Sequence, residues 1–97
     1  MKKQQIIDKL KQHHREIEKF GVKKIALFGS YAKNTAVTGS DIDIYISFDA
    51  GKEKYDNFIG LCFFLDDLFP GKKVEVVTEG GVSPYIEPEI RQTAVYV

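Results

Sequence analysis

Residues 41–48 read DIDIYISF, so that isoleucine or phenylalanine occupies every second position. Side chains on a β-strand point alternately to opposite faces, and this segment is therefore predicted to be a strand with one face in a core. The core face holds Ile42, Ile44, Ile46 and Phe48. The opposite face begins with two carboxylates, Asp41 and Asp43.

Upstream of this strand, the sequence predicts a helix, a strand and a turn. Apolar residues recur every three to four positions over residues 3–19, which indicates an amphipathic helix that ends at Gly21. The short apolar segment 23–28 is predicted to be a buried strand. Gly29 and Ser30 form the turn that leaves it, with Ser30 as the N-cap of a short helical turn.

Downstream, two further helices and one strand are predicted. Residues 55–69 carry a broad apolar stripe that includes Phe63, which is typical of a buried central helix. Residues 72–77 are predicted to be a strand. Ser83 is expected to cap a last helix over residues 84–93. The element order α-β-α-β-α-β-α predicts an α/β (α+β) fold with a small mixed sheet of about three strands backed by helices.

The composition predicts one soluble domain. A chain of 97 residues has room for a single hydrophobic core, so residues 1–97 are expected to be one domain. The formal net charge of zero gives no overall basic field, and we expect neither direct nucleic-acid binding nor attachment to a membrane. No signal peptide or long apolar run is visible, and Cys62 is the one cysteine, so a reducing cytoplasm is the expected setting.

Three acidic residues are expected to gather at one edge of the sheet. Asp41 and Asp43 lie two positions apart on one strand face, about 7 Å apart at the usual rise. Glu75 alternates with the valines of the next predicted strand, so its side chain can lie beside those of Asp41 and Asp43. Carboxylate oxygens are the ligands that Mg²⁺ prefers, and two such ions can hold the attacking and leaving oxygens of a phosphoryl transfer. A glycine and a serine at the exit of a buried strand suit a phosphate, which places Gly29 and Ser30 in the same site.

The spacing of these residues resembles a known family. Gly29-Ser30, ten further residues and Asp41-Ile42-Asp43 match the G-S-x10-D-x-D pattern of the polymerase-β-type nucleotidyltransferases, and the short chain resembles their minimal nucleotidyltransferase (MNT) branch. The segments LFGSYA, SDIDI, GKKVEVVT and SPYIEPEI are similar to those of MNT antitoxins that are paired with HEPN-domain ribonuclease toxins.

The resemblance implies a role for each residue of the motif. The triphosphate would be held by Gly29, Ser30, Lys33 and Ser40, and the catalytic metal ligands for two Mg²⁺ ions would be Asp41, Asp43 and Glu75. Glu75 stands where many relatives have aspartate. Lys33 stands where the antitoxins often have arginine, and lysine cannot make the bidentate contact of an arginine.

The resemblance also implies an activity and a partner. The chain is expected to be an enzyme that transfers a nucleoside monophosphate, AMP from ATP, to a hydroxyl group of a HEPN toxin. Two alternatives stay open. The protein could neutralise a toxin by stoichiometric binding without catalysis, or it could modify a small molecule, for which one small domain offers little enclosure unless it forms a homo-oligomer. The tyrosines are interpreted as packing residues, and no base pocket is assigned.

Overall fold

The alternating segment forms β2 (Ile42–Phe48), an inner strand of a four-stranded sheet in the computed structural model, which describes residues 1–97. The strand order is β3-β2-β1-β4, with β1 at Val22–Phe28, β3 at Val74–Thr78 and β4 at Val95–Tyr96. β1 pairs antiparallel with β2 and β4, whereas β2 and β3 are parallel. The predicted mixed sheet is confirmed, with four strands in place of about three.

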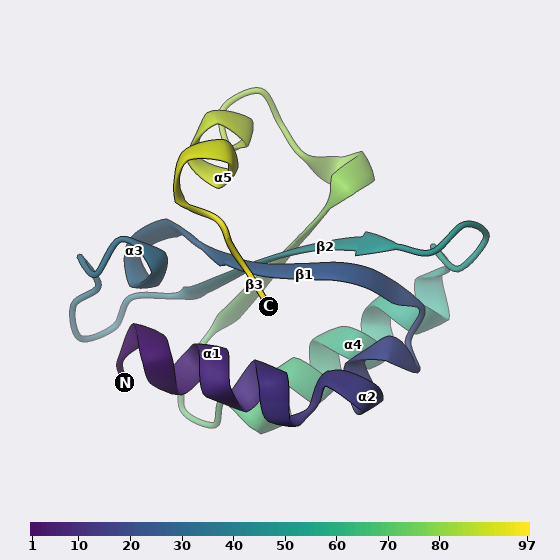
Figure 1. The fold of residues 1–97 in the computed structure, drawn as a ribbon, viewed down its shortest axis with the longest axis horizontal. Helices are drawn as coiled ribbons and strands as arrows, with labels where there is room; N and C mark the ends of the chain where they lie inside the picture. The colour runs from purple at the N-terminus through teal and green to yellow at the C-terminus, as the bar shows by residue number, and fades with distance from the viewer.

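Helices cover both faces of the sheet (Figure 1). One face is covered by α1 (Lys3–Gln12), α2 (His14–Glu18) and α4 (Tyr55–Leu68), and α5 (Glu87–Thr93) crosses the other. The core between the sheet and the first group contains fully buried residues, including Ile6, Leu10, Ile42, Ile44, Ile46, Leu61 and Leu65. The alternation in β2 therefore directs its isoleucines to this core and leaves the polar face under α5.

The predicted first helix is two helices. α1 ends at Gln12 and α2 begins at His14, with His13 in a non-helical conformation between them. The His13 ring packs edge-on against Phe64, and its Nδ1 lies 3.0 Å from Glu16 Oε2. Because the apolar periodicity continues across this break, the sequence shows a single helix.

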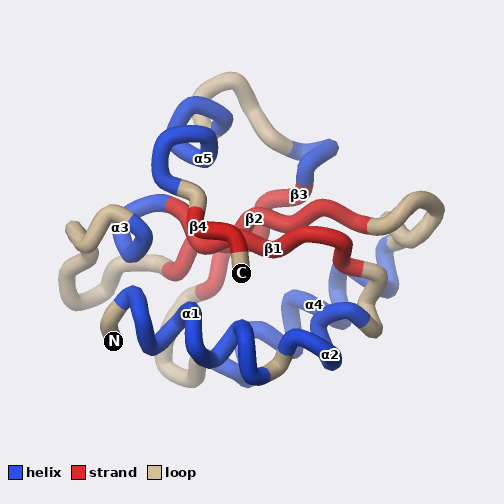
Figure 2. The backbone as a smooth tube through the Cα atoms, in the orientation of Figure 1, coloured by secondary structure: helices blue, strands red, loops and turns tan.

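The turn after β1 differs from the prediction in one detail. α3 (Gly29–Ala32) begins at Gly29, and Phe28 rather than Ser30 occupies the N-cap position. Ser30 is therefore the second residue of the helix. Figure 2 shows the following loop, residues 33–41, running beside α3 at the end of the sheet where β2 begins.

The last helix starts later than predicted, at Glu87. The Ser83 hydroxyl accepts a hydrogen bond from the Ile86 N–H at 3.3 Å, which closes a turn before the helix begins. Pro88 consequently lies in the first helical turn, where its missing N–H costs nothing. A 3-10 turn, η1 (Glu79–Gly81), and the two-residue strand β4 were not predicted.

The expectation that α4 is a buried central helix is correct for one of its faces only. Leu61 and Leu65 are fully buried, but the side chain of Phe63 is 67% exposed and that of Tyr55 is 77% exposed. α4 has 14 residues and is the longest helix of the structure. None of the helices is both long and apolar enough to cross a membrane.

Candidate active site

Asp43 and Glu75 are paired across the two parallel strands β2 and β3. Residues paired in this way project to the same face of a sheet, with Cβ atoms about 5 Å apart. Asp41 precedes β2 by one residue and shares the period-two face of Asp43. The structure therefore brings the three predicted acidic residues to one end of the sheet, on the face that α5 crosses.

The carboxylate of Asp43 lies directly against Gly29. Asp43 also pairs with Phe28, the last residue of β1, so the turn that follows passes over its side chain. Gly29 has φ +77°, and a Cβ atom added there would overlap the Asp43 carboxylate. Only glycine fits this position without strain or displacement of Asp43. The Gly29 turn and Asp43 therefore form one compact unit.

Asp43 is surrounded by other acidic groups. Burial and the negative charges of Glu75, Glu89 and Asp41 raise the pKa of Asp43 from 3.8 to about 6. Desolvation makes the largest contribution, and the three neighbouring carboxylates follow in that order. An ionised carboxylate in such surroundings is destabilised unless a positive charge joins it. A bound cation or a proton on Asp43 would relieve this repulsion.

Glu89 and Thr93 also lie at this site, although no sequence pattern indicates them. Both lie on α5, four residues apart, and therefore on one side of the helix. The Thr93 hydroxyl accepts a hydrogen bond from the Gly29 N–H at 3.0 Å and donates one to the Glu89 carbonyl at 2.7 Å. Their four-residue spacing indicates from the sequence alone that they share one side of a helix. Nothing in the sequence indicates that this side of α5 meets Gly29.

Of the predicted phosphate-binding residues, Gly29 and Ser30 begin α3, Lys33 follows it, and Ser40 lies in the loop before β2. The first N–H groups of a helix lack intrahelical partners, and Thr93 takes that of Gly29, so the N–H groups of Ser30 and Tyr31 remain. Lys33 lies at the end of this helix, with Nζ 3.7 Å from Glu89 Oε1. The Ser40 hydroxyl accepts a hydrogen bond from the Val37 N–H at 2.9 Å and so closes the turn that leads to Asp41.

Asp41, Asp43 and Glu75 carry the carboxylate oxygens that Mg²⁺ prefers, but their side chains do not converge on one point. Glu75 Oε1 lies 3.3 Å from Lys73 Nζ, which holds that carboxylate toward the solvent. No three His, Cys, Asp or Glu side chains in the structure are placed to hold one metal ion together. Oxygen donors with mutual repulsion, as at Asp43, fit a hard divalent cation. The metal-ligand roles of Asp41, Asp43 and Glu75 stay a prediction.

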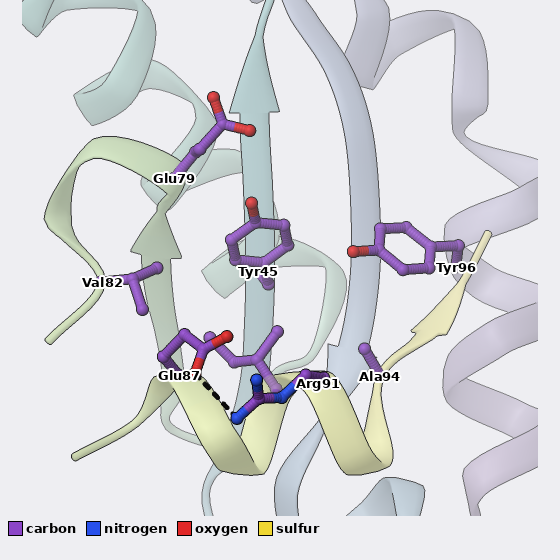
Figure 3. Close-up of a pocket in the computed structure, with 8 residues that line it drawn as sticks. Tyr45, Glu79, Val82, Glu87, Arg91, Ala94 and Tyr96 are labelled. Atoms are coloured by element: carbon purple, nitrogen blue, oxygen red, sulfur yellow. Dashed lines mark ion pairs between the residues drawn. The ribbon is translucent and has the colours of Figure 1, made fainter. Parts of the chain in front are cut away.

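A hollow of about 450 Å³ lies on the same face of the sheet, on the other side of α5 (Figure 3). Tyr45 and Tyr96 meet there edge to face, with ring centroids 6.4 Å apart. Glu87 and Arg91 of α5 form an ion pair at its border, 3.1 Å between Oε2 and Nη2. Burial, followed by the charge of Glu79, raises the pKa of Tyr45. Glu87 and Arg91 thus face this hollow, whereas Glu89 and Thr93 face the carboxylates.

Comparison with known proteins identifies the family of this chain. Residues 4–97 match the model of the nucleotidyltransferase domain family. The chain belongs to this family. Among its relatives, MJ0128 of Methanocaldococcus jannaschii, named as a candidate protein adenylyltransferase, is 41% identical over 95 residues, covering 96% of this chain and 95% of that protein. The protein adenylyltransferase MntA of Thermococcus cleftensis is 34% identical over 89 residues, covering 91% and 88%.

Solved structures show the same nucleotidyltransferase fold. A minimal nucleotidyltransferase superposes with a TM-score of 0.80 at 23% identity, over 98% of this chain and 95% of that one. One chain of a complex between a tri-AMPylated HEPN toxin and an MNT antitoxin of Shewanella oneidensis superposes with a TM-score of 0.57 at 20% identity, over 97% and 66%. The fold and the transferase class predicted from the sequence are therefore confirmed.

Proposed function

We propose that this protein transfers AMP from ATP to a hydroxyl group of a HEPN-domain toxin and thereby acts as its antitoxin. The observation that carries the proposal is the placement of Asp43 against the Gly29 turn and opposite Glu75. This arrangement puts the Gly29 turn and acidic side chains within one small site, as a site for a metal-bound triphosphate would require. The names of the adenylyltransferase relatives, and the AMPylated toxin in the Shewanella complex, support the choice of AMP and of the partner.

In this proposal the start of α3 binds the outer phosphates of ATP. The Ser30 hydroxyl, the N–H groups of Ser30 and Tyr31 and the ammonium of Lys33 supply the donors. Gly29 allows the backbone to pass close to Asp43, so the α-phosphate comes to lie over the acidic residues. The acceptor hydroxyl then releases its proton to the solvent and its oxygen forms a bond to the α-phosphorus. The bond from that phosphorus to the bridging oxygen breaks, and pyrophosphate leaves with the electron pair.

The charges of the site require a cation for this reaction. Asp41, Asp43 and Glu75 contribute three negative charges, and a triphosphate contributes about four more, so the two would repel each other. Asp41, Asp43 and Glu75 would hold Mg²⁺, which when bound neutralises phosphate charge and makes the α-phosphorus more electrophilic. Glu75 would have to exchange its contact with Lys73 for the metal. Without Mg²⁺ we expect little ATP binding.

The proposal is tested with a HEPN-domain toxin. Purified toxin, labelled ATP and Mg²⁺ are incubated with the wild-type protein or with Asp43→Asn, and label on the toxin is measured. Transfer by the wild type alone supports the proposal. Equal labelling with both proteins, or none with either, contradicts it. Toxin neutralisation that persists in Asp41→Asn/Asp43→Asn would instead favour stoichiometric binding.

A further inference from the structure

We infer that Glu89 competes with bound nucleotide for Lys33 and so weakens the affinity of the protein for ATP. This inference rests on the proposed function, because it concerns the ATP that the same site would bind. Glu89 is then a positioning residue, since it acts on the nucleotide through Lys33.

The contact between the two residues is specific. Lys33 Nζ lies 3.7 Å from Glu89 Oε1, and each side chain takes part in no other ion pair. The pair joins the end of α3, the helix that begins at Gly29, to the first half of α5. Both side chains are about half exposed, at 47% and 44%, so Lys33 can leave Glu89 without passing through the core.

The backbone around Glu89 is fixed at this place. The Thr93 hydroxyl links the Glu89 carbonyl to the Gly29 N–H, with distances of 2.7 and 3.0 Å. α5 therefore cannot move away from the turn without breaking this bridge. When a nucleotide binds at the turn, Lys33 already has Glu89 as its anionic partner. Glu89 stays nearby after the phosphates have replaced it at Lys33.

The balance of charge favours the nucleotide in this exchange. Lys33 carries one positive charge, so its ammonium group cannot form a close ion pair with Glu89 and with the phosphates at the same time. An exposed ion pair is weak and a triphosphate carries about four negative charges, so ATP displaces Glu89 at a modest loss of affinity. Removing the Glu89 charge should remove this loss and tighten ATP binding about two- to fivefold.

Glu89 could instead weaken ATP binding by direct repulsion, because its charge also reaches Asp43. A double-mutant cycle separates the two routes, since it measures whether the effect of one residue depends on the other. If Glu89 acts through Lys33, replacing Glu89 has an effect only while Lys33 is present. If it repels the phosphates directly, the effect persists when Lys33 is replaced.

The experiment measures the binding of ATP in excess Mg²⁺ by calorimetry. The proteins are the wild type, Glu89→Gln, Lys33→Gln and the double variant, with circular dichroism to confirm folding. Glu87→Gln is the matched control, because Glu87 lies on the same helix and pairs with Arg91 on the side away from the carboxylates. A second variant, Glu89→Asp, keeps the charge but withdraws it by one methylene.

We expect tighter binding by Glu89→Gln, intermediate tightening by Glu89→Asp, and no change for Glu87→Gln. We expect weaker binding by Lys33→Gln and no further effect of Glu89→Gln in that background. In the transfer reaction, Glu89→Gln should lower the KM for ATP and leave the KM for the acceptor unchanged.

The inference is overturned if Glu89→Gln binds ATP no more tightly than the wild type, or if it tightens binding equally without Lys33. Equal tightening by Glu87→Gln would also overturn it, because the effect would then be one of net charge. If the wild type binds no ATP with Mg²⁺, the proposed function fails as well. If the wild type binds and transfers normally, only the inference about Glu89 is at stake.

Discussion

Asp43 and Gly29 are in direct contact at the end of the β1–β2 pair, and glycine is the one residue that permits this contact. The same Asp43 faces Glu75 across the parallel pairing of β2 and β3. Two strand pairings and one turn thus meet at a single carboxylate. Its surroundings raise its pKa, so the arrangement costs stability and is expected to serve a cation.

Gly29→Ala should destabilise the protein more than Gly51→Ala does. Both glycines have φ +77°, so each alanine bears a left-handed backbone cost of about 1–2 kcal/mol. The Cβ at residue 51 meets no atom within 4 Å, whereas that at residue 29 overlaps Asp43. Crowding should add at least about 1 kcal/mol at residue 29. Chemical unfolding of both variants measures the difference, and equal values would contradict the contact.

Asp43 should titrate with a pKa of about 6 in the metal-free protein. Glu75→Gln should lower this pKa, because the charge of Glu75 raises it more than that of Glu89 or Asp41 does, whereas burial would still hold it above 3.8. An NMR titration of the Asp43 carboxyl carbon, in buffer with a chelator, measures both values. A wild-type pKa near 3.8, or an unchanged pKa in Glu75→Gln, would contradict the described surroundings.

The raised pKa also predicts how stability depends on pH. The folded protein binds the Asp43 proton more tightly than the unfolded chain, so this residue stabilises the fold below pH 3.8 and loses that contribution as the pH rises through about 6. Asp43→Asn has no such loss. Its unfolding free energy relative to wild type should therefore increase between about pH 4 and pH 6 and level off above that range. A difference that is constant with pH would contradict the prediction.

Leu61→Ala and Phe63→Ala should have very different effects although both lie on α4. Leu61 is fully buried, and its truncation should cost about 2–5 kcal/mol. Phe63 is 67% exposed, and its truncation should change stability by no more than about 0.5 kcal/mol. Thermal unfolding of both variants compares them. A large loss in Phe63→Ala would show that Phe63 is buried, as its place in the predicted apolar stripe implied.

The parts of the fold that depend on local pattern could be predicted from the sequence. The strict alternation in residues 41–48 predicts β2 and its buried face, and Gly21 ends the first helical region with φ +84°. The break at His13 could not be predicted, because the apolar periodicity continues across it; in the structure the His13 side chain contacts Glu16 and Phe64. β4 has two residues and exists only through its pairing with β1.

For the site too, the residues that follow from local pattern could be predicted and those that depend on packing could not. The spacing from Gly29 to Asp43, together with the alternation in β3, indicates which side chains share a face. The sequence does not show that α5 crosses that face, since this depends on the path of the chain after β3. Glu89 and Thr93 were therefore missed. The pairing of Glu75 with Lys73 was missed because either residue could equally have pointed to solvent alone.

Nucleotide transfer by this protein is expected to need Asp43. The decisive measurement is the rate at which label from ATP appears on the toxin, with Mg²⁺ in excess, for the wild type and Asp43→Asn. We expect the variant to be at least about 100-fold slower, because losing electrostatic stabilisation of the transition state costs about 3 kcal/mol or more. A folded Asp43→Asn protein that transfers label at the wild-type rate would contradict the account.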